Sequence, residues 1–200
     1  MIAHVLLIEK DVFSIGWNKP MEINIQNITA SIELGNEINL EQCTKKLEGH
    51  ISYDPKSFPG LIYRQTTEMP VFLLFSSGNV VCTGARSEKS LRSSIKSFIT
   101  MLSKKKLLSV SCSGVRVQIE NIIATASMNV KKFDLEILAS VLDNVFFEGN
   151  SCLIHKLPDL GVSFLIFETG KIICQGKTSE QKIRKSIRHL FRLIKELKTL

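Results

Sequence analysis

Apolar side chains recur along the chain at two different spacings. In residues 88–102 they follow the spacing of an amphipathic helix, and they are Leu91, Ile95, Phe98, Ile99 and Leu102. Ser87, directly before this segment, is a residue type that caps helix N-termini. Other apolar runs are short, such as VFLLF at 71–75 and VVCT at 80–83, and these predict strands.

The same pattern occurs a second time in the chain. The run FSSGNVVCTGARSE at 75–88 returns as FETGKIICQGKTSE at 167–180, an offset of 92 residues (from 75 to 167). Upstream, NITAS from Asn27 is matched by NIIATAS from Asn121. The apolar helix positions return at the offset of 92 as Ile183, Ile187, Leu190, Phe191 and Ile194. We therefore predict two copies of one structural half.

Each copy is predicted to contain a strand, a short helix, several further strands and a long helix. The short helices are expected to begin at the cap residues Asn39 and Asp134. This order is typical of an α+β fold with helices on one face of an antiparallel sheet. The predicted organisation is an N-terminal extension in residues 1–20, a first repeat in 21–110 and a second repeat in 111–200.

Both faces of the predicted strands are apolar. In the run VFLLF, alternation puts three apolar side chains on one face and two on the other. One long and one short helix can cover only one sheet face in each half, so the second face is expected to take a partner. From the residues alone, that partner is the N-terminal extension, a second protein chain, the other half packed face to face, or a ligand.

The charge of the chain suits a polyanionic partner without requiring one. It carries 26 Lys+Arg against 19 Asp+Glu, a formal net charge of +7. Many proteins with such an excess of positive charge bind no nucleic acid. Charge alone therefore leaves the partner open.

Several classes of function are disfavoured by what the chain lacks. Its cysteines are odd in number and form no C-x-x-C pair, which predicts reduced core residues and neither a zinc site nor a cofactor; they are Cys43, Cys82, Cys112, Cys152 and Cys174. No apolar run approaches the roughly 18 residues of a membrane span, and the first residues do not read as a signal peptide. Clustered acids, a Ser-His-Asp arrangement and a phosphate-cradling loop are also missing. We expect an intracellular protein that is not an enzyme.

Several segments resemble the signature segments of the TATA-binding protein family. They are QNITA, FPGLIYR and LLFSSGNVVCTGARSE in the first half, and QIENIIATAS and FETGKIICQGKTSE in the second. The resemblance runs from about Met21 to the C-terminus. It implies two pseudo-symmetric repeats forming a saddle, with a curved antiparallel sheet and helices on the convex face.

The resemblance also implies a function. Members of this family are general transcription initiation factors that bind and bend TATA-like promoter DNA through the minor groove. The expected partners are double-stranded promoter DNA, a transcription factor IIB-like protein and the RNA polymerase machinery. The expected compartment is the nucleus in a eukaryote, or the cytoplasm and nucleoid in an archaeon.

The family's DNA-contacting positions can be carried over onto this chain. Central amides that would bond to base acceptors are Asn27 and Asn121. Contacts to the groove floor would come from Thr29, Leu73, Val81, Thr83, Ile123, Leu165 and Ile173. Phosphate contacts would come from Arg64, Ser77, Lys156, Thr169 and Lys171, and wedges between base steps from Phe58, Phe75 and Phe167.

The second half departs from the family pattern. Asn150 aligns with the place of a wedge phenylalanine, so one wedge is expected to be lost. Gln175 replaces the threonine that would match Thr83, and Glu168 adds a negative charge beside Phe167. These departures motivate an alternative function, a protein-interaction scaffold of the same fold whose DNA binding is weakened or non-specific.

Two aromatic residues are candidates to replace the lost wedge. They are Phe146 and Phe147, which precede Asn150 in the same loop region. Phe147 aligns better with Tyr53 and is expected to be a core residue.

Overall fold

Each repeat folds as one strand, one short helix, four strands and one long helix. The computed structural model describes residues 21–196 except 69, 109–113, 129–131 and 150. The predicted N-terminal extension and the position of Asn150 thus lie outside the described residues. The first repeat contains β1 (Ile23–Glu33), α1 (Leu40–Lys46), β2 (His50–Ser52), β3 (Leu61–Arg64), β4 (Val71–Leu74), β5 (Asn79–Ala85) and α2 (Glu88–Lys104). The second contains β6 (Arg116–Ser127), α3 (Leu135–Val141), β7 (Val145–Glu148), β8 (Cys152–Leu157), the 3-10 turn η2 (Pro158–Leu160), β9 (Val162–Phe167), β10 (Lys171–Gly176) and α4 (Glu180–Glu196).

The chain forms two compact units whose borders do not coincide with the repeats. One unit spans Gln26–Ile122, and the other joins the residues up to Ile25 to those from Ile123 onward. In the first unit the strands follow the order β2-β3-β4-β5-β1-β6, and in the second β6-β10-β9-β8-β7. The start of β1 therefore belongs with the second repeat, where the Arg184 guanidinium donates to the Ile23 carbonyl oxygen at 3.0 Å.

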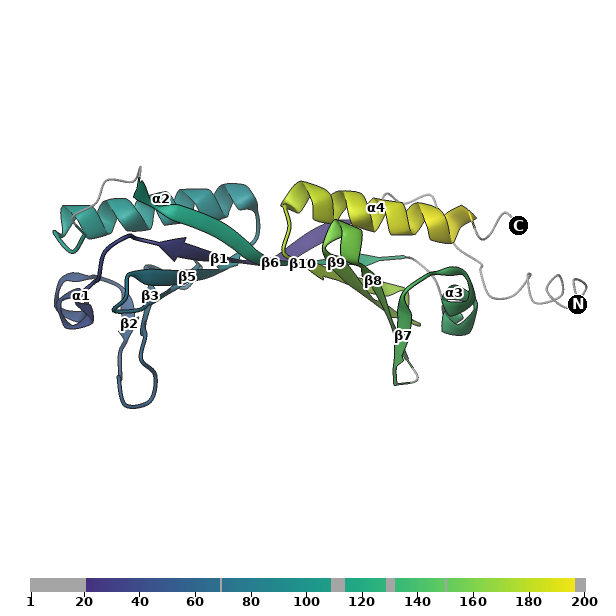
Figure 1. The fold of residues 1–200 in the computed structure, drawn as a ribbon, viewed down its shortest axis with the longest axis horizontal. Coiled ribbons are helices and arrows are strands. Elements are labelled where there is room, and N and C mark those ends of the chain that lie inside the picture. Colours follow the sequence, from purple (N-terminus) through teal and green to yellow (C-terminus); the bar gives the residue numbers. More distant parts are fainter. Residues whose placement is uncertain (1–20, 69, 109–113, 129–131, 150, 197–200) are drawn as a thin grey trace, which may run out of the picture. The chain divides into compact units, whose positions relative to one another are not determined.

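The long helices bury the faces that their apolar spacing predicts. All five predicted residues of α2 are buried, and four of the five in α4, whereas Phe191 is only half-buried. In each half the long helix lies along one face of that half's strands (Figure 1). The predicted caps also form: Ser87 Oγ accepts from the Ser90 N–H at 3.1 Å, and Asn39 Oδ1 accepts from the Gln42 N–H at 2.9 Å.

The core of the first half is built on stacked aromatic rings. Phe72 of β4 stacks on Phe98 of α2 with ring centroids 4.1 Å apart, and Tyr63 of β3 packs against Phe98 at 5.7 Å. The Tyr63 hydroxyl donates to the sulfur of Met101 at 3.2 Å, so this buried phenol has a partner. Helix α2 is held to its sheet by this cluster.

The cysteines that the structure describes are buried and free, as the sequence predicts. Cys43, Cys82, Cys152 and Cys174 lie in the core, and Cys112 lies outside the described residues. Burial raises the pKa of the Cys82 and Cys174 thiols to about 12. These two side chains therefore stay protonated and act as small apolar residues.

A buried histidine takes the place of Tyr63 in the second half. His155 of β8 is 3% exposed, stacks on Phe164 of β9 at 6.1 Å, and places Nδ1 2.8 Å from the Asp143 carbonyl oxygen. Burial lowers the pKa of His155 below its ordinary value of 6.5, and the bond to Asp143 opposes that shift only in part. The core of the second half therefore accommodates a neutral imidazole.

We expect the second half to lose stability in mild acid because of His155. In the unfolded chain His155 takes up a proton near pH 6.5, whereas in the folded chain its pKa is lower. The free energy of unfolding is therefore highest above pH 6.5 and decreases as the pH falls from 6.5 toward the pKa of the folded state. Thermal unfolding of wild type and His155→Tyr between pH 7.5 and 5 measures this, with His50→Gln as the exposed-histidine control. The melting temperature of His155→Tyr should depend less on pH than that of wild type. An equal dependence on pH in wild type and His155→Tyr would contradict the prediction.

Candidate nucleic-acid interface

One face of the first-half sheet carries an apolar row that the helices do not cover. Ile62, Leu73 and Val81 lie directly opposite one another across β3, β4 and β5, and the row ends at Ser31 of β1, whose hydroxyl donates to the Glu120 carboxylate at 2.7 Å. The neighbours of these four residues along each strand are buried. Ser31, Leu73 and Val81 are half-buried, and Ile62 has 36% of its surface exposed. Residues that pair directly point to the same side of a sheet, so the row lies on the open face.

An amide and two hydroxyl groups meet on this open face. The Asn27 amide nitrogen donates to Thr29 Oγ1 at 3.3 Å and to Thr83 Oγ1 at 3.2 Å, and the two hydroxyl oxygens are 2.9 Å apart. The Asn27 side-chain oxygen accepts from the Gly84 N–H at 2.7 Å. A backbone N–H can only donate, so the Asn27 side-chain oxygen must face the Gly84 N–H. The NH₂ group of Asn27 then points toward the two threonine hydroxyl groups.

Two phenylalanine rings pack against each other beside the apolar row. Phe58 is in the β2–β3 loop, where its N–H donates to the Asp54 carbonyl oxygen at 2.9 Å, and Phe75 follows β4. Their ring centroids are 5.8 Å apart with an edge-to-face tilt of 68°. Gly60 permits this contact, because a Cβ there would lie 2.6 Å from the Phe58 ring and 3.0 Å from the Phe75 ring. The glycine of the FPGLIYR motif thus makes room for the pair.

The second half has an equivalent open row with a different outer residue. Phe146, Ile154, Leu165 and Ile173 lie opposite one another across β7, β8, β9 and β10. Leu165 and Ile173 are half-buried, and Phe146 is 55% exposed. Phe167 is half-buried and lies opposite Cys152, outside this row.

The remaining carried-over residues lie where solvent reaches them. Ser77, Lys156, Thr169 and Lys171 are exposed, and Arg64, Asn121 and Ile123 are half-buried. The Ser77 hydroxyl accepts from the Asn79 N–H at 3.4 Å in the β4–β5 turn. The negative charge of Glu168 is paired, with Lys132 Nζ 3.2 Å from its carboxylate. The acid beside Phe167 is therefore partly compensated.

Sequence reasoning missed two members of these rows, Ile62 in the first half and Ile154 in the second, which share the open faces through their register. Phe146, predicted above only as a candidate to replace the lost wedge, lies in the row of Ile154. Strand alternation in LIYR would have shown Ile62 to lie opposite to the buried Leu61 and Tyr63. The expectation that Phe147 is a core residue is wrong, since it is 52% exposed on the edge strand β7.

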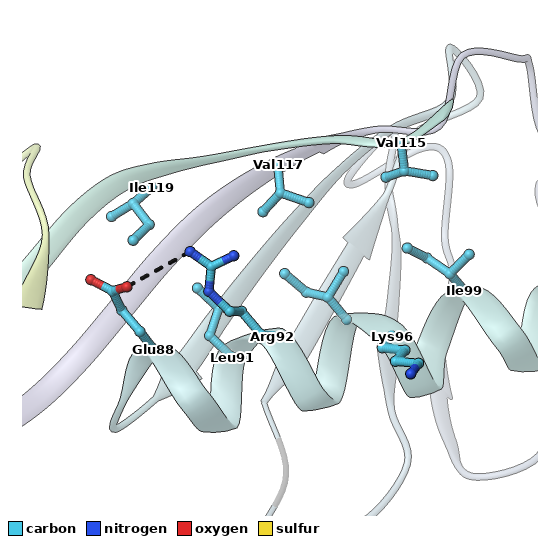
Figure 2. A pocket seen from close by; sticks show the side chains of 9 residues that line it. Glu88, Leu91, Arg92, Lys96, Ile99, Val115, Val117 and Ile119 are labelled. Carbon is cyan, nitrogen blue, oxygen red and sulfur yellow. Dashed lines mark ion pairs between the residues drawn. The ribbon is translucent and has the colours of Figure 1, made fainter. Parts of the chain in front are cut away.

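A separate cavity lies on the helix side of the first half. It has a volume of about 270 Å³ between α2 and the start of β6, and its apolar lining includes Leu91, Ile95, Val115, Val117 and Ile119 (Figure 2). Arg92 and Glu88 form an ion pair of 3.9 Å at its rim. This lining offers no nucleophile with a matching base. Among the described residues no group of three or more His, Cys, Asp or Glu is placed to hold a metal ion.

These features define a class of protein. It has two repeated α+β halves, each exposing an apolar sheet face with phenylalanine side chains near its edge. In the described part of the chain, no helix is long and apolar enough to cross a membrane. An exposed apolar sheet face of this kind is typical of a surface that takes a partner.

Comparison with known proteins identifies the family. The family model described as "Transcription factor TFIID (or TATA-binding protein, TBP)" matches residues 22–105 and 116–197. The chain belongs to the TATA-binding protein family. Because this is a family of transcription factors, no enzymatic activity is assigned to the chain.

Individual relatives agree with this assignment. The TATA-box-binding protein of Pyrobaculum aerophilum is 35% identical over 185 residues, covering 92% of this chain and 91% of the relative. That of Methanopyrus kandleri is 34% identical, covering 84% and 93%. The solved structure of Methanococcus jannaschii TBP matches with a TM-score of 0.71 at 31% identity, covering 88% of this chain and 99% of that one. The predicted two-repeat α+β fold is confirmed.

Proposed function

We propose that this chain is a general transcription initiation factor that binds and bends TATA-like promoter DNA through the minor groove. The observation that carries the proposal is the open apolar row beside the oriented Asn27 amide. The floor of an A·T minor groove offers only acceptors and lacks the guanine amino group. Apolar side chains can press on such a floor, and an NH₂ group can donate to it.

Each part of the open face has a task under this proposal. Leu73, Val81, Thr29 and Thr83 contact the groove floor in the first half, and Leu165, Ile173 and Ile123 do so in the second. Asn27 and Asn121 donate to base acceptors, while Arg64, Ser77, Lys156, Thr169 and Lys171 contact phosphates. Phe58, Phe75 and Phe167 insert at base steps, where unstacking costs on the order of a few kcal/mol and is offset by the greater surface wrapped.

Recruitment of further proteins belongs to the same proposal. A factor that marks a promoter acts by holding a transcription factor IIB-like protein and RNA polymerase machinery at that place. The site of action is the compartment that contains the chromosome. The alternative of a scaffold with weakened DNA binding is not favoured, since the matched relatives carry the name TATA-box-binding protein.

A binding comparison tests the proposal. We expect the chain to bind a TATA duplex on the order of 10³-fold more tightly than a scrambled duplex of equal length. Fluorescence anisotropy measures the affinities, and energy transfer between end labels measures the bend. If Arg64, Lys156 and Lys171 are the cationic phosphate contacts, log K should fall against log salt with a slope of about −3. Equal binding to both duplexes would contradict specific recognition and support the scaffold.

A further inference from the structure

The outer strand of the second half presents an exposed aromatic ring on the open face. Phe146 of β7 lies directly opposite Ile154, which lies opposite Leu165. The ring therefore points to the same side as the proposed floor residues, and it is 55% exposed. At the edge of this strand order, Phe146 extends the apolar row outward.

A cation accompanies the ring. Lys156 of β8 shares the open face with Ile154, and its Nζ lies 5.3 Å from the centroid of the Phe146 ring. An ammonium group over an aromatic face is held there by the ring quadrupole. The pair therefore presents an apolar surface and a positive charge side by side.

The first half has no such pair at the matching place. Ser52 lies opposite Ile62 just as Phe146 lies opposite Ile154, so a short polar side chain takes the place of the ring. Phe146 also does not fill the place of a wedge beside Phe167. It belongs to the Ile154 row, whereas Phe167 belongs to the row of Cys152. The register of β7 therefore indicates that Phe146 contacts a ligand at a different place from a wedge residue.

We propose that Phe146 and Lys156 form a subsite for the sugar-phosphate backbone of DNA at the outer strand of the second half. The inference rests on the proposed minor-groove function. A duplex whose groove floor lies on Leu165 and Ile173 presents deoxyribose and phosphate, rather than base edges, to the outer strand. The ring packs against the apolar face of a deoxyribose, and the ammonium group, already held beside the ring, meets the adjacent phosphate. The subsite strengthens the binding of DNA by the second half, in which the sequence has Asn150 at the place of a wedge phenylalanine.

The favoured ligand is DNA rather than a protein for two reasons. The subsite is continuous with the proposed floor through direct strand pairing, so a duplex on the floor reaches it without a second docking event. Its charged member is a cation, which matches a phosphate. A protein partner would be indicated instead if variants of Phe146 left DNA binding unchanged.

The test compares two neighbouring exposed phenylalanines. Phe146→Ser introduces the residue that the first half has at Ser52, and Phe147→Ser is the control, because Phe147 is 52% exposed and points to the other side of the strand. We expect Phe146→Ser and Phe146→Leu to weaken binding to a TATA duplex by about 5- to 30-fold, in line with losing one aromatic contact to nucleic acid. Phe147→Ser should change affinity less than 2-fold, and Phe146→Tyr should retain binding.

Salt dependence separates the two members of the subsite. Lys156→Gln should make the slope of log K against log salt shallower by about 1, while Phe146→Ser should leave the slope unchanged. Wild-type affinity in both Phe146 variants, or equal loss in Phe147→Ser, would overturn the subsite alone. Failure of the wild-type chain to prefer the TATA duplex would overturn the proposed function and the subsite together. Thermal unfolding of each variant establishes that the fold is retained.

Discussion

Replacing both Phe58 and Phe75 with alanine is expected to weaken binding to a TATA duplex by roughly 10²- to 10³-fold and to reduce the bend. An aromatic contact with a base is worth about 1–3 kcal/mol, and two such rings act together at this end of the site. The rings pack edge to face at 5.8 Å, so each holds the other in position for insertion. Anisotropy and end-to-end energy transfer on wild type and variant measure both effects.

The fold should tolerate this double change, which keeps the test informative. Phe58 is 36% exposed and Phe75 half-buried, and neither belongs to the stacked core of the half. Gly60→Ala offers a second route to the same end, because its Cβ would collide with the Phe58 ring while leaving both aromatics in the sequence. Phe147→Ala serves as the control for losing an exposed ring elsewhere. An unchanged bend in the double variant would exclude the wedge role.

Replacing Phe98 with alanine is expected to lower the free energy of unfolding of the first half by about 3–5 kcal/mol. Phe98 is 3% exposed and is the residue of α2 on which both Phe72 and Tyr63 pack. Removing its ring leaves a cavity between helix and sheet and ends two aromatic contacts. Urea unfolding followed by circular dichroism measures the loss.

A matched control lies two residues away on the same helix, on its exposed face. Lys96 is exposed, and Lys96→Ala should change the free energy of unfolding by no more than about 0.5 kcal/mol. A loss below about 1 kcal/mol for Phe98→Ala would mean that the aromatic stack does not hold α2 to its sheet. An equal loss in both variants would point to helix propensity rather than to packing.

Much of the candidate site could be predicted from strand alternation and from the family resemblance. Strand alternation separates Leu73 and Val81 from their neighbours Phe72 and Val80, but both faces are apolar, so only the family resemblance indicates which face is open. The orientation of Asn27 could not be predicted in this way, because the group that sets it is the N–H of Gly84, 57 residues further along the chain. The same holds for the Phe58–Phe75 contact, which depends on the path of the β2–β3 loop and on the space left at Gly60.

The second half shows where local reasoning fails. Of the five apolar positions predicted in α4, four are buried, and only Phe191 is half-buried. This prediction succeeds because helical spacing is a property of a short segment. The places of Phe146 and Phe147 depend instead on the register of β7 with β8, since a shift of one residue exchanges the two faces. The alignment of Phe147 with Tyr53 could not predict that Phe147 is exposed on the edge strand β7.

The sequence by itself determined the duplication, the helices with their caps, and the alternation that makes both faces of each strand apolar. These are local properties, set by side-chain spacing and by hydrogen bonds within a few residues. Only the tertiary structure decided which residues share a row, how the Asn27 amide is oriented, and that the start of β1 belongs with the unit of the second repeat. Each of these depends on contacts between segments far apart along the chain, and residue spacing alone does not specify such contacts.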